Sequence, residues 1–325
     1  MVSFIDKLNP EQKAAVTLPA ESALILAGAG SGKTRVLTTR IAWLIEQSMA
    51  SPLEILAVTF TNKAAKEMLT RIQASIPVNT RGMWVGTFHG LCNRMLRRHF
   101  KEAGLPQTFQ ILDQTDQLSA IKRLMKAHGI SVDEYPPKDV QNYIASAKEE
   151  GLRARDMTAE FGKKENMAKI YALYEEQCNR EGVADYGELL LRSYELLARN
   201  EMIRRHYQDR FRFILVDEFQ DTNSIQADIF YMLAGPDGNL FVVGDDDQSI
   251  YKFRSADSSI MLDFPKTFPK CRTIYMDTNY RSGTEVIKYA GNLIRINKNR
   301  FEKNFHGFRE EQGAVSAIAC NGPNE

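Results

Sequence analysis

The chain has 325 residues, and its 42 Lys plus Arg against 41 Asp plus Glu give it a formal charge of +1. This near-neutral balance excludes a protein that holds nucleic acid by bulk positive charge alone, and a hydrophobic content of 43% excludes disorder as the main state. The length predicts about two domains, each with a core of its own.

Six short runs rich in β-branched and aliphatic residues lie between turn residues. Several of them are apolar at consecutive positions, as in strands that are buried on both faces of a parallel sheet. Helical patterns separate many of the runs, which is the alternation of an α/β domain. The predicted strands are residues 22–27, 54–59, 83–86, 213–217, 239–243 and 273–276.

The middle of the chain, from about Leu91 to Asp185, contains no convincing strand pattern. Its apolar residues recur at helical spacing instead, which predicts a helical insertion within the α/β domain. The lysines and arginines there are typical of a solvated face, although a nucleic-acid face stays open. The helical stripes are Leu118, Ile121, Leu124 and Met125, then Val140, Tyr143, Ile144 and Ala147, then Met167, Ile170, Tyr171, Tyr174 and Cys178.

A glycine-rich segment, AGAGSGKTR, follows the first predicted strand and precedes a helical pattern. This context predicts a phosphate-binding loop, in which backbone amides and a helix N-terminus face the phosphates. Lys33 can reach the β and γ phosphates and the Thr34 hydroxyl can bind Mg²⁺; a dinucleotide fingerprint is excluded because Lys33 occupies its last glycine position. The alternative, a glycine-rich turn with a chance lysine, is disfavoured by the flanking elements. The loop residues expected to contact ATP are Ala27, Gly28, Ala29, Gly30, Ser31, Gly32, Lys33 and Thr34.

Two carboxylates, Asp217 and Glu218, end the apolar run FILV. In a phosphate-loop fold a carboxylate at such a strand end holds Mg²⁺, and a second one can orient and deprotonate the attacking water. We assign the first role to Asp217 and the second to Glu218. Taken alone, the pair would be interpreted as the acidic start of a helix.

No run of about 18 apolar residues and no signal-peptide pattern is found in the sequence, so we expect a cytoplasmic protein without a membrane partner. The four cysteines lie too far apart for a zinc knuckle or a redox pair, and we expect reduced thiols.

Seven motifs in order complete the argument: LNPEQKAAV, AGAGSGKT, AVTFTNKAAKEM, GTFHGLCNRML, LVDEFQDTN, VGDDDQSIYKFRSA and TNYRS. From about Leu8 to about Arg300 the chain resembles the superfamily 1 DNA helicases of the UvrD, Rep and PcrA group. The resemblance implies two RecA-like domains that use ATP and Mg²⁺ to translocate 3′ to 5′ on single-stranded DNA.

The resemblance also implies roles for five residues near the nucleotide. Gln12 would bind the adenine edge, Tyr280 would stack on the adenine, and Arg35 would lie beside the nucleotide. Gln248 would sense the γ-phosphate. Arg281 would be an arginine finger, which stabilises the transition state only when a second domain closes. With Lys33, Asp217 and Glu218, the residues Gln248 and Arg281 form the predicted catalytic set.

A second set of residues, in loops after strands, would contact DNA. Aromatic rings stack on bases of any sequence, and small polar groups and arginine bind phosphates. Singly, each aromatic is more typical of a core, so the resemblance carries this assignment. The set is Phe60, Thr61, Asn62, Thr87, Phe88, His89, Tyr251, Phe253 and Arg254, where Phe253 stands in place of the family's usual tryptophan.

The segment DYGELL resembles the point where the family's chain re-enters the first core domain. The expected division is residues 1–90 and 186–278 for the first RecA-like domain, 91–185 for the helical insertion, and 279–325 for the truncated start of a second RecA-like domain. We therefore expect the N-terminal part of a helicase, weakly active or inactive by itself and unable to unwind duplex alone.

The expected partners are single-stranded DNA, single-strand/duplex junctions, and repair or replication proteins that bind through parts outside this chain. Two alternatives stay open. One is a nucleotide-independent module that binds single strands or a protein partner. The other is the motor part of a recombination helicase-nuclease.

Overall fold

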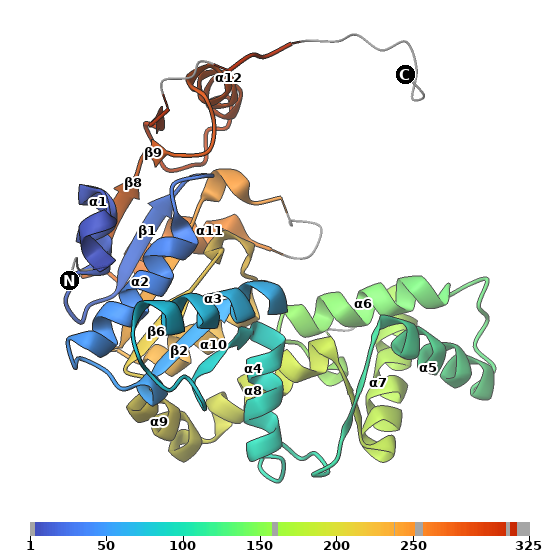
Figure 1. Cartoon of the computed structure of the whole chain (residues 1–325). Helices are drawn as coiled ribbons and strands as arrows, with labels where there is room; N and C mark the ends of the chain where they lie inside the picture. The colour runs from blue at the N-terminus through green and yellow to red at the C-terminus, as the bar shows by residue number, and fades with distance from the viewer. Residues whose placement is uncertain (1–3, 158–161, 237, 251–255, 310–312, 317–325) are drawn as a thin grey trace.

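A six-stranded parallel sheet forms the centre of the molecule (Figure 1). The computed structural model describes residues 4–157, 162–236, 238–250, 256–309 and 313–316. The strand order is β3-β2-β6-β7-β1-β8, and every pair is parallel. All six predicted strands and the α/β class are confirmed. The strands are β1 (Ala23–Ala27), β2 (Ile55–Thr59), β3 (Trp84–Thr87), β6 (Phe213–Val216), β7 (Asn239–Gly244) and β8 (Arg272–Met276).

Helices cover both faces of this sheet, which explains why its inner strands are apolar at consecutive positions. In β1, Ala23 and Ile25 pack on one face, whereas Leu24 and Leu26 pack on the other. The first face is covered by α1 (Pro10–Val16), α2 (Lys33–Glu46) and α3 (Asn62–Ser75). The second is covered by α4 (Phe88–Arg98), α8 (Tyr186–Arg199), α9 (Glu201–Arg210), α10 (Ser224–Ala234) and α11 (Ser258–Thr267).

The insertion has a hydrophobic core of its own and lies to the right of the sheet in Figure 1. Its helices are α5 (Gln114–Ala127), α6 (Pro137–Glu149) and α7 (Lys163–Glu181). The three predicted helical stripes fall on these helices. Most of their residues are buried against one another in a cluster separate from those of the sheet.

Two short strands correct the expectation that residues 91–185 lack strands. β4 (Gln110–Leu112) and β5 (Val183–Asp185) form a parallel pair. Each has three residues, too few for an alternating pattern to stand out.

The start of the insertion is a separate point. Leu91, Cys92 and Met95 of α4 pack in the cluster that covers the second face of the sheet. The boundary at residue 91 stays a prediction.

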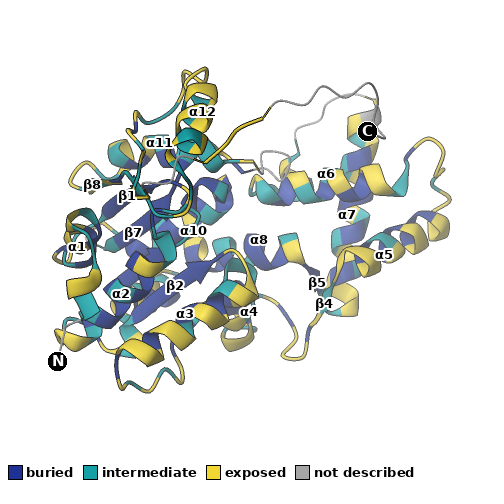
Figure 2. Ribbon diagram, turned by 45° about the horizontal axis from the view of Figure 1, so that its top comes forward, coloured by how far each residue is buried: buried dark blue, intermediate teal, exposed yellow. Residues whose placement is uncertain are grey.

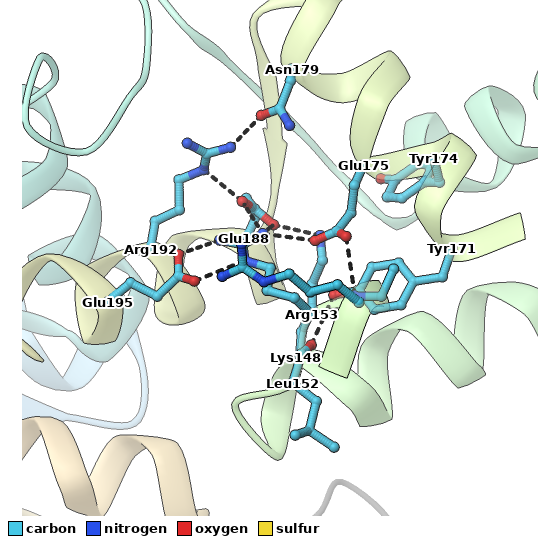
Figure 3. Close-up of polar contacts among 12 residues, drawn as sticks. Lys148, Leu152, Arg153, Tyr171, Tyr174, Glu175, Asn179, Glu188, Arg192 and Glu195 are labelled. Carbon is cyan, nitrogen blue, oxygen red and sulfur yellow. Dashed lines mark hydrogen bonds and ion pairs between the residues drawn. The ribbon is translucent and has the colours of Figure 1, made fainter. Parts of the chain in front are cut away.

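A buried ion network joins the insertion to α8 (Figure 3). Lys148 Nζ of α6 lies 2.9 Å from Asp185 Oδ2 and 2.8 Å from Glu188 Oε2, and the Lys148 side chain is 2% exposed. Arg153 is the N-cap of the short 3-10 helix Ala154–Asp156. Its Nη1 lies 2.8 Å from Glu188 Oε1. The helix α8 therefore receives ion pairs from the insertion along its first turns. Arg153 also pairs with Glu175 and Glu195, and Arg192 pairs with Glu188.

The last described segment leaves the sheet after β8. β9 (Thr278–Asn279) pairs in parallel with β10 (His306–Gly307), and α12 (Thr284–Ile294) lies between them in sequence. None of the residues of α12 is buried, so this helix is teal and yellow in Figure 2, whereas the central strands β1 and β2 are dark blue. Among the described residues, no helix is both long and apolar enough to cross a membrane.

Candidate nucleotide and DNA site

The phosphate loop connects β1, which ends at Ala27, to α2, which begins at Lys33. Gly30 and Gly32 have φ values of 75° and 94°, a region that glycine adopts without the cost that a Cβ brings. Gly32 is the N-cap of α2, and no side chain caps this helix end. The first amides of α2 therefore remain available for an anion, which is the property that a phosphate site requires.

Three predicted catalytic side chains converge above this loop. Lys33 Nζ lies 2.9 Å from Glu218 Oε2 and donates a hydrogen bond of 3.2 Å to Gln248 Oε1. Glu218 follows β6 and Gln248 follows β7, and the two strands are neighbours in the sheet. The carboxyl ends of parallel strands lie at one edge of the sheet. Glu218 and Gln248 therefore contact Lys33, although each is more than 180 residues from it in the sequence.

In the acidic pair after β6, Glu218 has an unusual backbone conformation. Glu218 has a φ of 51°, an uncommon region for a residue with a side chain that is often found at functional sites. Its amide donates to Asp217 Oδ1 at 3.1 Å. Burial, and then the nearby charge of Glu218, raise the pKa of Asp217 to about 7. A cation beside Asp217 would favour the charged carboxylate and so oppose both effects.

Two of the predicted adenine-side residues, Gln12 and Tyr280, are linked through Asn9. Gln12 is buried, and its Nε2 donates to Ser31 O at 2.8 Å. Asn9 Nδ2 donates to Tyr280 OH at 2.8 Å, and Asn9 also caps α1 in a reciprocal pair with Gln12. The Gln12 amide thus supports the loop itself. Arg35 Nη2 donates to Lys7 O at 2.7 Å.

The segment after β8 contacts the phosphate loop directly. Asn279 Nδ2 donates to Ala29 O at 2.7 Å, and Asn279 Oδ1 accepts from the Arg281 amide at 2.8 Å. A Cβ added at Gly30 would lie 2.6 Å from Arg281 Cβ. Arg281, the predicted arginine finger, therefore packs against the backbone of the loop at Gly30. Sequence reasoning assigned no role to Asn279, although it lies next to Tyr280 in TNYRS.

Other contributors were also missed. Gln220 Nε2 donates to Glu218 Oε2 at 2.9 Å, and its Oε1 accepts from the Asp245 amide at 3.0 Å. Gln220 thus joins the loop ends of β6 and β7. A Cβ added at Gly28 would lie 2.5 Å from the Phe305 ring. Nothing in the sequence pattern marks Phe305, because its partner is 277 residues away.

The described members of the predicted DNA set follow β2 and β3, at the same edge of the sheet. Thr61 and Thr87 accept hydrogen bonds from amides at the starts of α3 and α4, and Phe60 is 45% exposed. Tyr251, Phe253 and Arg254 lie outside the described residues. A cavity of about 290 Å³ is lined by Phe60, Thr87, Phe88 and His89 together with Asp217, Glu218 and Asp221.

Two members of this set are partly engaged in packing. Phe88 makes an edge contact with Phe230, with the ring centroids 4.9 Å apart. His89 faces the Tyr186 ring, and burial lowers the pKa of His89 below its usual value, which favours a neutral ring. Among the aromatic members of this set that the structure describes, Phe60 is therefore the most exposed and offers the most surface for a base.

Comparison with known proteins gives a consistent answer. The model of one family, the UvrD/REP helicase N-terminal domain, matches residues 8–269. The chain is 48% identical over 302 residues to the DNA helicase II of Escherichia coli K12, covering 92% of this chain and 42% of that protein. It is 42% identical to the probable DNA helicase II homolog of Rickettsia conorii over 98% of this chain and 49% of that protein.

A third relative is the ATP-dependent DNA helicase PcrA of Staphylococcus epidermidis, 39% identical over 93% of this chain and 42% of that protein. The chain thus spans less than half the length of these curated relatives. The resemblance predicted from the seven motifs is confirmed, and the chain belongs to the UvrD/REP helicase N-terminal domain family.

Proposed function

We propose that this chain is the ATP-binding part of an ATP-dependent DNA helicase that translocates 3′ to 5′ on single-stranded DNA. The observation that carries the proposal is the meeting of Lys33, Glu218 and Gln248 from three strand ends above an uncapped helix N-terminus. The relatives are named as DNA helicases, one of them as ATP-dependent, which supports an ATP-dependent helicase activity.

Each group then has a role in hydrolysis. Lys33 binds the terminal phosphates, Glu218 orients and deprotonates the attacking water, and Gln248 senses the γ-phosphate. Arg281 adds positive charge when a second domain closes. Lys33 pairs with Glu218 at 2.9 Å. An incoming γ-phosphate competes for Lys33 and frees the Glu218 carboxylate, so the base becomes available when there is a substrate to hydrolyse.

Magnesium fits the oxygen donors at this site. A hydroxyl from Thr34 and a carboxylate from Asp217 are hard ligands of the kind that Mg²⁺ prefers, with water and phosphate completing the shell. Within the described ranges, no group of three or more His, Cys, Asp or Glu could hold a metal, so nucleotide phosphates would supply part of the coordination. Bound Mg²⁺ would neutralise charge that develops on the phosphates.

DNA would cross the carboxyl edge of the sheet, where Phe60 and His89 line the same cavity as Glu218. This shared cavity supports coupling between DNA contact and the water-activating carboxylate. We further propose that single-strand/duplex junctions and repair or replication proteins bind the longer protein, that it works in the cytoplasm, and that residues 279–325 begin its second RecA-like domain.

The first test is Lys33→Ala. Because Lys33 supplies a charged hydrogen bond to phosphate, its removal is expected to weaken ATP binding by at least about 10-fold. Fluorescence anisotropy of a labelled ATP analogue measures the affinity, with Lys66→Ala on the exposed face of α3 as the control. Nucleotide binding unaffected by Lys33→Ala would contradict the proposal and favour the nucleotide-independent binding module.

A second test concerns DNA. Phe60→Ala removes an exposed stacking ring and is expected to weaken oligo-dT binding by about 1–3 kcal/mol. The control is Leu53→Ala: Leu53 is 48% exposed and precedes β2, whereas Phe60 follows it. Both variants remove a similar exposed apolar side chain at opposite ends of one strand. Equal losses in the two variants would contradict a DNA site at the carboxyl edge.

A further inference from the structure

A lysine far from the recognised motifs is buried in the acidic turn after β7. Lys303 Nζ lies 2.5 Å from Asp245 Oδ1, 2.5 Å from Asp246 Oδ1 and 2.8 Å from Asp247 Oδ2. The Lys303 side chain is 0% exposed. Three carboxylates this close together repel one another unless a cation lies between them, and Lys303 supplies that cation.

The same segment holds the turn at two more points. Arg300 makes a two-pronged contact with Asp247, with distances of 2.7 Å from Nε and 2.6 Å from Nη2. The Phe301 amide donates to Asp246 Oδ2 at 2.9 Å. Residues 300–303 therefore contact every carboxylate of the turn. Of Arg300, Phe301 and Lys303, only Lys303 contacts Asp245 in these bonds.

Asp245 connects this cluster to the nucleotide site. Its Oδ2 accepts a hydrogen bond of 2.6 Å from Gln248 Nε2, while its Oδ1 faces Lys303. With Nε2 held by Asp245, the Gln248 amide presents Oε1 to Lys33 Nζ. The path from Lys303 to the phosphate-binding lysine thus runs through two side chains, Asp245 and Gln248.

We propose that Lys303 is a positioning residue for γ-phosphate recognition: by holding Asp245, it fixes the orientation of the Gln248 amide. The inference rests on the proposed function and deepens it, because it makes the γ-phosphate response depend on a segment that follows α12. Without the Lys303 charge, Asp245 is repelled by its neighbours and no longer holds Gln248 Nε2.

The test measures how strongly the chain prefers a triphosphate to a diphosphate. Dissociation constants for Mg·AMP-PNP and Mg·ADP are measured for the 325-residue chain and for Lys303→Met, Gln248→Ala and the double variant. Lys303→Met is expected to reduce the preference for AMP-PNP by about 10-fold and to leave the ADP affinity unchanged. The double variant should lose no more than Gln248→Ala, since the two residues act in one path.

Two further variants separate charge from packing. Lys303→Arg keeps a cation and is expected to restore part of the preference. Lys298→Met, an exposed lysine of the same segment, is the matched control and should match the wild type. A preference that survives Lys303→Met, or additive losses in the double variant, would overturn the inference.

Loss of ADP binding together with AMP-PNP binding in Lys303→Met would also overturn it, because Lys303 would then be required for folding alone. Failure of the proposed function gives a different result. In that case the wild-type chain itself binds neither nucleotide, or binds both independently of Lys33.

Discussion

Glu218→Gln is expected to slow ATP hydrolysis by about 10²- to 10⁴-fold, the usual contribution of a general base. The amide retains the size of the carboxylate and can still orient a water molecule, but it cannot accept the proton. Because Lys33 loses its 2.9 Å ion-pair partner, one competitor for phosphate binding is removed, and nucleotide affinity is expected to be retained or to increase.

Single-turnover phosphate release with oligo-dT and excess protein measures this effect even where turnover is slow. Glu67→Gln on the exposed side of α3 is the control. An unchanged rate would contradict the role given to Glu218. It would direct attention to Asp221, which lines the same cavity and whose pKa is raised to about 6 by burial and by Glu218.

The central sheet and its phosphate loop could be predicted because their signals are local. Buried parallel strands are apolar at consecutive positions, and the loop needs its glycines within a few residues of Lys33. The parallel topology then brings Glu218 and Gln248 to one edge. The strand β4 was not predicted, because its three residues, Gln110–Leu112, are too few to show a periodic pattern.

Contacts between distant segments left no local signal. Gln12 was assigned to adenine on the basis of resemblance, yet its Nε2 binds Ser31 O of the phosphate loop, a role that no pattern around Gln12 reveals. Lys303 lies 58 residues from Asp245 in a stretch that looks like an ordinary solvated segment. Its burial depends on the fold of the chain after α12, which composition does not specify.

These distant contacts share one consequence. Asn279, Lys303 and Phe305 all follow β8, and each contacts the loops that carry Lys33 or Gln248. A displacement of this segment would therefore disturb the phosphate loop and the acidic turn together. Such linkage is what an enzyme requires if hydrolysis is to depend on the position of a neighbouring domain.

Lys148→Met is expected to destabilise the insertion by about 3 kcal/mol, at the lower end of the cost of breaking a buried ion pair. The substitution leaves Asp185 and Glu188 without their shared cation. The cost stays moderate because Asp185 retains hydrogen bonds from Gln117 and Tyr174, and Glu188 retains its arginine partners (Figure 3).

Urea unfolding measures the change. Circular dichroism follows all helices, whereas the two tryptophans, Trp43 and Trp84, lie in the sheet domain. The transition seen by circular dichroism should move to lower urea more than the fluorescence transition does. Lys169→Met, which breaks an exposed pair with Glu165, is the control and is expected to cost less than about 1 kcal/mol. Equal shifts in the two variants would contradict a structural role for the buried network.

The pH dependence of stability gives an independent check on the role of Lys148, through its ion-pair partner Glu188. Burial alone would raise the pKa of Glu188, but Lys148, Arg153 and Arg192 outweigh burial and hold it below its usual range. Because this pKa is lowered, Glu188 stabilises the native chain at pH values above the pKa of about 4.3 that it has in the unfolded chain. This contribution is lost as the pH falls further, toward the pKa of the folded chain. In Lys148→Met the Glu188 carboxylate loses one of the cations that lower its pKa, so it can take up a proton at higher pH, which relieves its repulsion with Asp185. The stability difference between Lys148→Met and the wild type should therefore shrink as the pH is lowered from 7 toward 4, whereas a difference caused by lost packing would stay constant.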